Sequence, residues 1–284
     1  MELTKENYYT RENTAISNTK VNTFLLSKEL YYMKYITGEL PDEVTPLMLL
    51  GKLVDQTVEH GSVEWFKNNY TLAVRKKDDP DEFAKQKTMD PDRILSLDLY
   101  AKVIRMTDRI FRSPFFKEYG DKSQFQVPMI MKKEDINICG MLDILTVDKD
   151  TMYIDDLKTS RSSAMRNATS WAWHCQDMGY LRQLAVYGKL AEEQYPEIKN
   201  VVYRHFVISN SKSENFPIKL FVIPNELIEG KFDEFMDVAK QIVTEKDWID
   251  TLPSWEDAEE LPKILSTNQQ DNEEDTLDGM ESVE

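Results

Sequence analysis

Three short runs rich in β-branched and aromatic residues, at 125–131, 136–147 and 152–157, constrain the fold more than any other feature. Charged turns separate the runs, so we expect three consecutive strands, with the last two joined as a hairpin. Helical periodicity precedes them, and a helix around 178–195, strands at 201–208 and 218–223, and a helix at 225–247 follow. This order predicts an α/β fold in which helices flank a central mixed sheet, with an αβββαβ core.

The residues before the strands predict a helical region. A helix over 17–36 opens with a Ser17-Asn18 cap, and a second helix begins at Thr45-Pro46 and runs to about Glu59. A third amphipathic helix is expected over 97–116. The charged stretch 76–92 carries two prolines and predicts a loop or insertion.

Composition excludes several classes of protein. The 284 residues are 41% hydrophobic, which is enough for a core, and the two cysteines are too few for a disulfide framework or a four-cysteine zinc site. The sequence contains no apolar run long enough to span a bilayer and no secretion signal at its start, so we expect a soluble cytoplasmic protein that does not bind membranes.

The negative charge is concentrated at the carboxyl end. Residues 253–284 hold eleven acidic side chains and one basic side chain, so they contribute −10 to the total of −16. We expect one domain over 1–252, with a helical part at 1–116 and a core at 117–252, followed by an unstructured acidic tail at 253–284. The tail is either a partner-binding segment or an aid to solubility.

The candidate chemistry lies in two of the strands. Asp156 and Lys158 alternate on one strand and therefore project from the same face, and Asp143 lies on the preceding strand of the hairpin. Two carboxylates beside an ammonium suit Mg²⁺ or Mn²⁺ and the hydrolysis of phosphodiester bonds. Acid-x-Lys triplets also occur at 197–199 and 229–231, but only 156–158 combines a strand with an upstream Gly-x-x-Asp. The alternative is a solvated pair on an outer sheet face.

A polar stripe on the following helix supports a functional interpretation. Tyr180, Gln183 and Tyr187 share one helix face, and an amide between two tyrosines suits a polar cleft better than a core. Gln183 could instead simply reach water. Arg161 and Arg182 flank the proposed site and could contact DNA phosphates, or they could be surface residues. The Trp171–Trp173 pair is more consistent with packing than with base stacking.

Gly-x-x-Asp, Asp-x-Lys-Thr and Gly-Tyr-x-x-Gln-x-x-x-Tyr together resemble the PD-(D/E)XK nuclease superfamily. Within it, the sequence is similar to the RecB-like branch that includes phage and prophage exonuclease VIII (RecE-type) and lambda-type exonucleases. The resemblance covers roughly residues 8–223, with its specific part at 140–187. It implies a restriction-endonuclease-like core and a Mg²⁺-dependent DNA nuclease. Its site would comprise metal ligands Asp143, Asp156 and the Leu157 backbone carbonyl, with Lys158, Gln183 and Tyr187 as catalytic or supporting residues and Tyr180 as a DNA contact.

One position departs from this branch, whose members commonly carry Gly-x-x-x-His on an early helix. Here the matching residues are Gly51 and Asp55, so Asp55 would be a third metal ligand or would alter the metal preference. The four cysteines that hold an iron–sulfur cluster in CRISPR-associated members do not occur in this sequence.

The resemblance therefore implies an exonuclease that acts on duplex DNA ends in phage-type recombination, in the bacterial host cytoplasm if a phage encodes it. A single-strand annealing protein and a homo-oligomer are the implied partners. Three alternatives remain: an endonuclease of the same superfamily, a DNA- or protein-binding module with a decayed metal site, and a protein whose acidic tail is the functional part.

Overall fold

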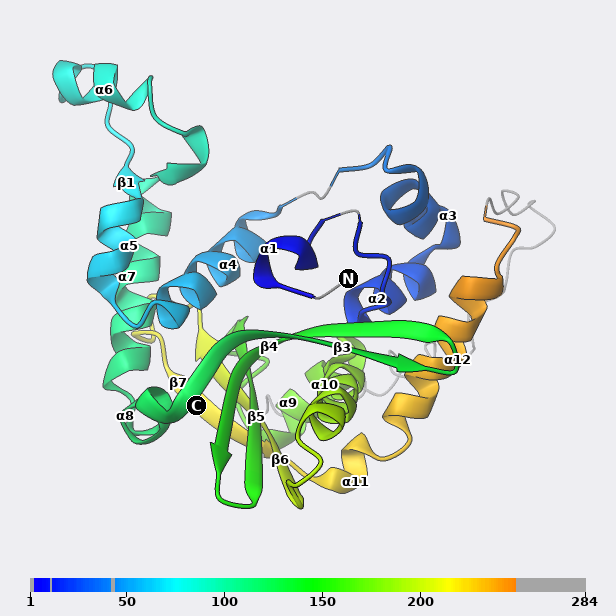
Figure 1. Ribbon diagram of the computed structural model, residues 1–284. Coiled ribbons are helices and arrows are strands. Elements are labelled where there is room, and N and C mark those ends of the chain that lie inside the picture. Colours follow the sequence, from blue (N-terminus) through cyan, green and yellow to red (C-terminus); the bar gives the residue numbers. More distant parts are fainter. Residues whose placement is uncertain (1–2, 11, 42–43, 249–284) are drawn as a thin grey trace, which may run out of the picture. The chain divides into compact units, whose positions relative to one another are not determined.

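A five-stranded mixed sheet forms the centre of the protein in the computed structural model, which describes residues 3–10, 12–41 and 44–248 (Figure 1). The strand order is β3-β4-β5-β6-β7, with antiparallel pairs except for the parallel pair β5-β6. The strands are β3 (Ser123–Lys133), β4 (Ile136–Asp148), β5 (Thr151–Ser160), β6 (Asn200–Ser209) and β7 (Ile218–Ile223). The α/β class and the three consecutive strands are confirmed.

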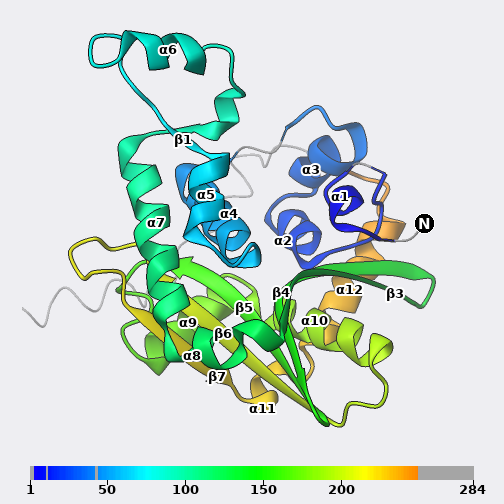
Figure 2. The same cartoon turned by 60° about the vertical axis from the view of Figure 1, so that its left-hand side comes forward.

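The parallel pair requires a crossover, which helices α9 (Ala168–Asp177) and α10 (Tyr180–Gln194) supply. Together with α2 (Asn18–Leu26) and α12 (Lys231–Thr244), they enclose one apolar cluster, which includes Trp171, Leu184 and Phe235. Figures 1 and 2 both place α10 beside β4 and α12 beside α10. This cluster forms the core on one face of the sheet.

A second apolar cluster covers the opposite face. It joins Leu157 and Phe206 of the sheet to α4 (Pro46–Glu59), α5 (Val63–Asn69), α7 (Leu97–Arg112) and α8 (Pro114–Tyr119). Alternate residues of β5 and β6 therefore face different helical layers, as the period of a strand requires. Asp156 and Lys158 lie on the face covered by α9 and α10, whereas the candidate Asp55 belongs to α4 of the opposite layer.

Three predicted helices are interrupted by residues that end or start a helical segment. The helix predicted over 17–36 breaks at Ser27, whose φ of −164° is extended and whose side chain caps the next turn. Ser113-Pro114 divides the 97–116 helix, and Gly230, with φ of +74°, divides the 225–247 helix. The remaining pieces are α3 (Lys28–Tyr31), a π-helical turn η1 (Tyr32–Thr37) and α11 (Asn225–Ile228).

The predicted loop over 76–92 contains a short helix. Asp79 caps α6 (Pro80–Gln86), and the short parallel strands β1 (Thr71–Leu72) and β2 (Ile94–Leu95) join the two ends of this insertion. Figure 2 shows it projecting beyond α5 and α7. The other short elements are α1 (Lys5–Tyr8) and the 3-10 turns η2 (Pro91–Arg93) and η3 (Gly120–Lys122).

The amino-terminal segment pairs with the first half of β4, along the edge that β5 does not reach. Ile16 donates its backbone N–H to Asn137 at 2.8 Å, and its carbonyl accepts from Cys139 at 3.0 Å. The described residues up to Trp248 form one compact unit. The acidic tail predicted at 253–284 lies outside the described residues.

Candidate active site

Asp143 lies where β4 and β5 separate. The pairing of β4 with β5 ends at Ile144 and Asp155. Beyond this point the Asp143 side chain, rather than a backbone carbonyl of β4, accepts a hydrogen bond from the β5 backbone. Its Oδ2 accepts the Leu157 backbone N–H at 3.0 Å, and its Oδ1 accepts from Gln126 Nε2 at 3.3 Å. Burial raises the pKa of Asp143 well above its usual range, and the neighbouring Asp156 carboxylate raises it further. The fork in the hairpin thus brings the two acids together.

Asp156 is fully buried beside Lys158. The Lys158 ammonium lies 2.5 Å from Asp156 Oδ2, and the lysine side chain is 16% exposed. Burial opposes the charged ammonium, but the carboxylates of Asp156 and Asp143 outweigh this effect and raise the pKa of Lys158. Lys158 therefore remains a cation near neutral pH.

Asp55 approaches the same carboxylates from α4. Gly51, one turn earlier, lies close enough to β5 that an added Cβ would be 3.5 Å from Thr159 Oγ1. Burial raises the pKa of Asp55 to about 7; Lys158 opposes this rise and Asp156 adds to it. The charges of Asp156 and Lys158 thus affect the pKa of Asp55, which lies near neutral pH.

The predicted stripe on α10 also faces this site. Gln183 Nε2 donates to Tyr187 Oη at 2.7 Å, and burial followed by the Asp143 charge raises the pKa of the Tyr187 phenol. The Lys158 ammonium lies 4.8 Å from the centre of the Tyr180 ring, within cation–π range. The amide and the tyrosines therefore support the charged residues from one helix.

Gly140 allows α10 to approach β4 this closely. A Cβ at this position would lie 2.8 Å from Leu190 Cδ1 and 2.9 Å from the Tyr187 ring. The glycine of the Gly-x-x-Asp motif thus has a packing reason, because any side chain would collide with Leu190 and the Tyr187 ring.

The two predicted arginine contacts occupy different environments. Arg161 is exposed just beyond the end of β5. Arg182 points its guanidinium toward α2, where Nε donates to Asn18 Oδ1 at 3.0 Å and Nη2 donates to Asn22 Oδ1. Burial lowers the pKa of Arg182. Arg182 thus joins two helices, and Arg161 remains available to solvent.

Sequence reasoning missed His205, which is buried behind Asp156. Its Nε2 lies 3.5 Å from Asp156 Oδ2, and its Nδ1 accepts from Trp171 Nε1 at 3.1 Å. Burial lowers the pKa of His205 to about 4, with Asp156 opposing the shift and Lys158 adding to it. A signal existed, since parallel pairing of the strand over 201–208 with the strand of Asp156 would place one of its residues opposite that carboxylate. Trp171 is buried, whereas Trp173 is exposed.

The carboxylates of Asp143 and Asp156 could bind a hard divalent cation that takes only a few of its ligands from the protein. Asp156 Oδ1 is buried with no hydrogen-bond partner in the described parts of the chain, which suits a ligand-binding carboxylate. Within the described residues, no three His, Cys, Asp or Glu side chains are grouped closely enough to hold a metal. Mg²⁺ typically uses one or two carboxylates and completes its shell with water and phosphate oxygens. Asp143 and Asp156 meet that requirement, whereas Asp55 does not complete a three-carboxylate cluster in this arrangement.

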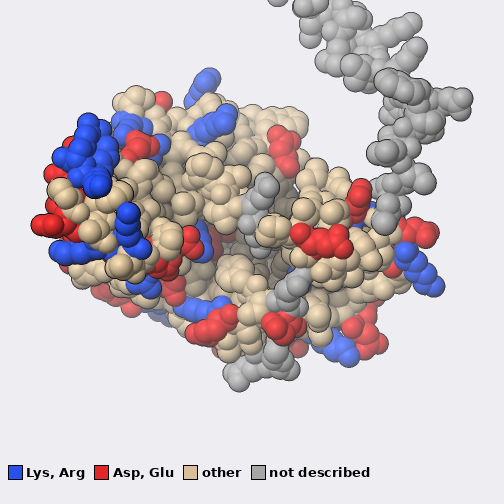
Figure 3. Space-filling model, turned by 90° about the horizontal axis from the view of Figure 1, so that it is seen from above, with Lys and Arg blue, Asp and Glu red and all other residues tan. Residues whose placement is uncertain are grey.

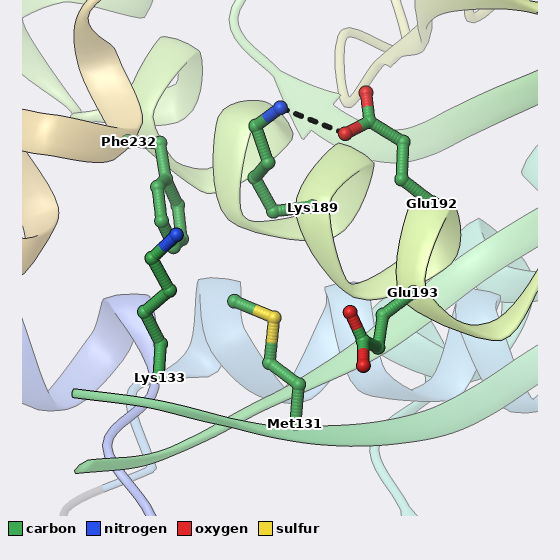
Figure 4. A pocket seen from close by; sticks show the side chains of 6 residues that line it. All are labelled: Met131, Lys133, Lys189, Glu192, Glu193 and Phe232. Atoms are coloured by element: carbon green, nitrogen blue, oxygen red, sulfur yellow. Dashed lines mark hydrogen bonds and ion pairs between the residues drawn. The ribbon is translucent and has the colours of Figure 1, made fainter. Parts of the chain in front are cut away.

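A separate pocket lies between β3, α10 and α12. It has a volume of about 160 Å³, and Figure 4 shows Met131 and Phe232 in its wall beside Lys133, Glu193 and the Lys189–Glu192 ion pair. None of the predicted site residues lines it, and its charges balance. The pocket is therefore distinct from the candidate active site.

In the described parts of the chain, no helix combines the length and the apolar character needed to cross a membrane.

The family described as "PDDEXK-like domain of unknown function (DUF3799)" matches residues 17–248. The chain belongs to this family. Its fold is shared with a solved protein from Eubacterium rectale described as "Putative exonuclease", with 19% identity, a TM-score of 0.60, and coverage of 86% of this chain and 85% of that one. A structure described as SSO0001 aligns with 13% identity and a TM-score of 0.28, over 69% of this chain and 83% of its own. No curated protein matches the chain. The resemblance to the PD-(D/E)XK superfamily is confirmed, and family and fold support a nuclease.

Proposed function

We propose that this PDDEXK-like protein is a Mg²⁺- or Mn²⁺-dependent deoxyribonuclease that removes nucleotides from duplex DNA ends. The convergence of Asp143, Asp156 and Lys158 carries the proposal, because it combines two hard oxygen ligands with a fixed cation. The "Putative exonuclease" description of the Eubacterium rectale protein, which shares the fold, supports exonuclease over endonuclease activity.

Each side chain has a distinct role in this proposal. Asp143 and Asp156 would hold the metal together with the Leu157 carbonyl, and Asp55, which does not complete a three-carboxylate cluster with them, would act as a water-mediated ligand. The bound metal would polarise the scissile phosphate and lower the pKa of the attacking water. Lys158 would position that water and stabilise the negative charge that develops on the phosphate oxygens. Gln183, Tyr187 and Tyr180 would keep these groups oriented.

The α6 insertion is neutral overall, with six basic and six acidic side chains over residues 73–93, but it exposes lysines that could contact a polyanion. Lys and Arg side chains gather on the left of Figure 3, and the surface beside them is hollowed. In the insertion, Arg75 pairs with Asp78, but Lys76 and Lys77 are exposed and pair with no acidic side chain among the described residues. Unpaired surface lysines and the exposed Arg161 suit DNA phosphates.

End-labelled linear duplex DNA, incubated with and without Mg²⁺, tests the activity. Cleavage should require the metal and should disappear in Asp156→Ala and Lys158→Ala. Lys199→Ala is the matched control, because Lys199 belongs to an acid-x-Lys triplet that lies exposed outside the site. Unchanged degradation by Asp156→Ala or Lys158→Ala would refute the assignment.

Covalently closed plasmid separates the two nuclease alternatives. An end-dependent exonuclease should leave the plasmid intact and degrade it after linearisation, whereas an endonuclease would cut both forms. Calorimetry with Mn²⁺ tests the remaining alternative. A binding module whose metal site has decayed should give no heat signal from site-specific Mn²⁺ binding.

A role in phage-type recombination, with a single-strand annealing protein as partner and a homo-oligomer as the active form, belongs to the same proposal. Sedimentation of the full chain, with and without residues 253–284, would test the oligomer and the contribution of the acidic segment.

A further inference from the structure

His205 lies directly opposite Asp156 on the neighbouring parallel strand. Both side chains have no exposed surface, and both project toward α9. The pairing of β5 with β6 thus places an imidazole behind the carboxylate, on the side away from solvent. The inference from this pair rests on the proposed function, because it concerns the orientation of a proposed metal ligand.

Trp171 determines which nitrogen of His205 carries the proton. An indole N–H can only donate, so His205 Nδ1, 3.1 Å from Trp171 Nε1, must be the acceptor. A neutral imidazole that accepts at Nδ1 carries its hydrogen on Nε2. The Cys175 thiol lies 3.5 Å from the same Nδ1 and is compatible with this tautomer.

The Nε2–H then has one acceptor within reach. Nε2 lies 3.5 Å from Asp156 Oδ2, and Nε2 has no hydrogen-bond partner among the described residues. A buried donor is costly when left unsatisfied, and a carboxylate oxygen can accept more than one hydrogen bond, so closing the short gap to Oδ2 is favourable. Lys158 pairs with the same Oδ2 at 2.5 Å. Oδ1 is the Asp156 oxygen that neither side chain contacts.

We propose that His205 is a positioning residue for Asp156: as the Nε2–H tautomer selected by Trp171, it donates to Oδ2 and leaves Oδ1 to face the metal. Such partners of metal-binding carboxylates orient the ligand and do not touch the substrate. A histidine that only fills the core would not need its tautomer fixed.

Nuclear magnetic resonance of protein labelled with ¹⁵N-histidine tests the tautomer directly. The chain has three histidines, so the His205 signals can be assigned by their loss in His205→Gln. We expect the ring proton on Nε2, hydrogen-bonded, in the wild type, and a mixture of tautomers in Trp171→Phe. A proton on Nδ1 in the wild type would overturn the proposal.

Calorimetry with Mn²⁺ on the full chain tests the consequence. His205→Leu should weaken binding by roughly 10- to 100-fold, whereas His205→Gln, which keeps a donor near the Nε2 position, should stay within about threefold of the wild type. His60→Gln is the matched control, since His60 is exposed and stacks on Trp65 outside the site. Thermal unfolding verifies that each variant is folded, and Trp171→Phe provides a second variant if His205→Leu does not fold.

Equal Mn²⁺ affinity in folded His205→Leu and wild type would overturn the positioning role while cleavage by the wild type upholds the proposed function. Conversely, a wild type that neither binds Mn²⁺ nor cleaves DNA would refute the proposed function. In that case the ¹⁵N-histidine spectrum alone would show whether His205 Nε2–H forms a hydrogen bond to Asp156.

Discussion

The Leu157 backbone N–H donates to Asp143 Oδ2 at the point where the β4–β5 hairpin opens. The acid that would bind metal therefore also satisfies a strand amide. Asp143→Asn can keep this acceptor, whereas Asp143→Ala leaves the amide unpaired. We expect both variants to lose DNA cleavage by about 100-fold or more, because one of two carboxylates is gone.

The stabilities of these two variants should differ. In urea unfolding without metal, Asp143→Ala should be less stable than Asp143→Asn by about 1–3 kcal/mol, the cost of an unsatisfied buried donor. Equal stability of the two variants would show that the Leu157 amide does not depend on this side chain.

Asp55 should make the metal-free protein less stable as pH rises. Its pKa is about 7 in the folded protein against an ordinary value of 3.8, so between these values the folded state holds a proton that the unfolded state releases. Stability must then fall as pH increases through this window, and the full penalty is present above pH 7. Asp55→Asn should therefore stabilise the protein more at pH 8 than at pH 5, measured by urea unfolding in chelator. A gain that is the same at both pH values would contradict the raised pKa.

Gly140→Ala should disturb the site through packing. The new methyl group would meet Leu190 and Tyr187 at less than 3.0 Å, so we expect a loss of about 1–3 kcal/mol together with reduced cleavage. Gly51→Ala is the matched control, because its Cβ would make an ordinary contact at 3.5 Å in a helix interior, where alanine is favoured. In thermal unfolding, the midpoint temperature should fall for Gly140→Ala and should stay the same or rise for Gly51→Ala.

A buried ion pair should stabilise the sheet without taking part in catalysis. Arg204 donates to both Asp155 oxygens, at 2.5 and 2.7 Å, and its guanidinium lies within 5.0 Å of the Phe115, Tyr119 and Tyr153 rings. Arg204→Ala should cost about 3–5 kcal/mol, because it leaves the Asp155 charge buried and unpaired. The double variant Asp155→Asn with Arg204→Met should recover part of this loss in urea unfolding. No recovery would indicate that the aromatic contacts, rather than the charge pairing, dominate.

The strands were predictable because a half-buried or buried strand requires its own pattern of apolar residues. The predicted runs at 125–131 and 152–157 lie inside β3 and β5, although each strand extends further at both ends. The helix interruptions were not predicted, since Ser27 and Gly230 occur within apolar periodicity that continues on both sides. Their effect depends on backbone dihedrals that tertiary packing selects.

The candidate site was predictable to the extent that its residues share a short sequence span. Asp143, Asp156 and Lys158 follow from one hairpin and the alternation of a strand. His205 was missed because its relation to Asp156 arises only when β6 pairs in parallel after a long crossover. Arg182 was placed on the right helix, but its contact with α2 depends on helix packing that spacing does not encode.

The backbone bridge between Ile16 and β4 sets a practical limit on shortening the protein. The family match begins at residue 17, yet removal of the preceding residues would strip the partners from the Asn137 carbonyl and the Cys139 amide. An exposed strand edge of this kind recruits other chains. A version trimmed to the family boundary should therefore be prone to self-association, and a tag is better placed ahead of the first helical turn than in place of it.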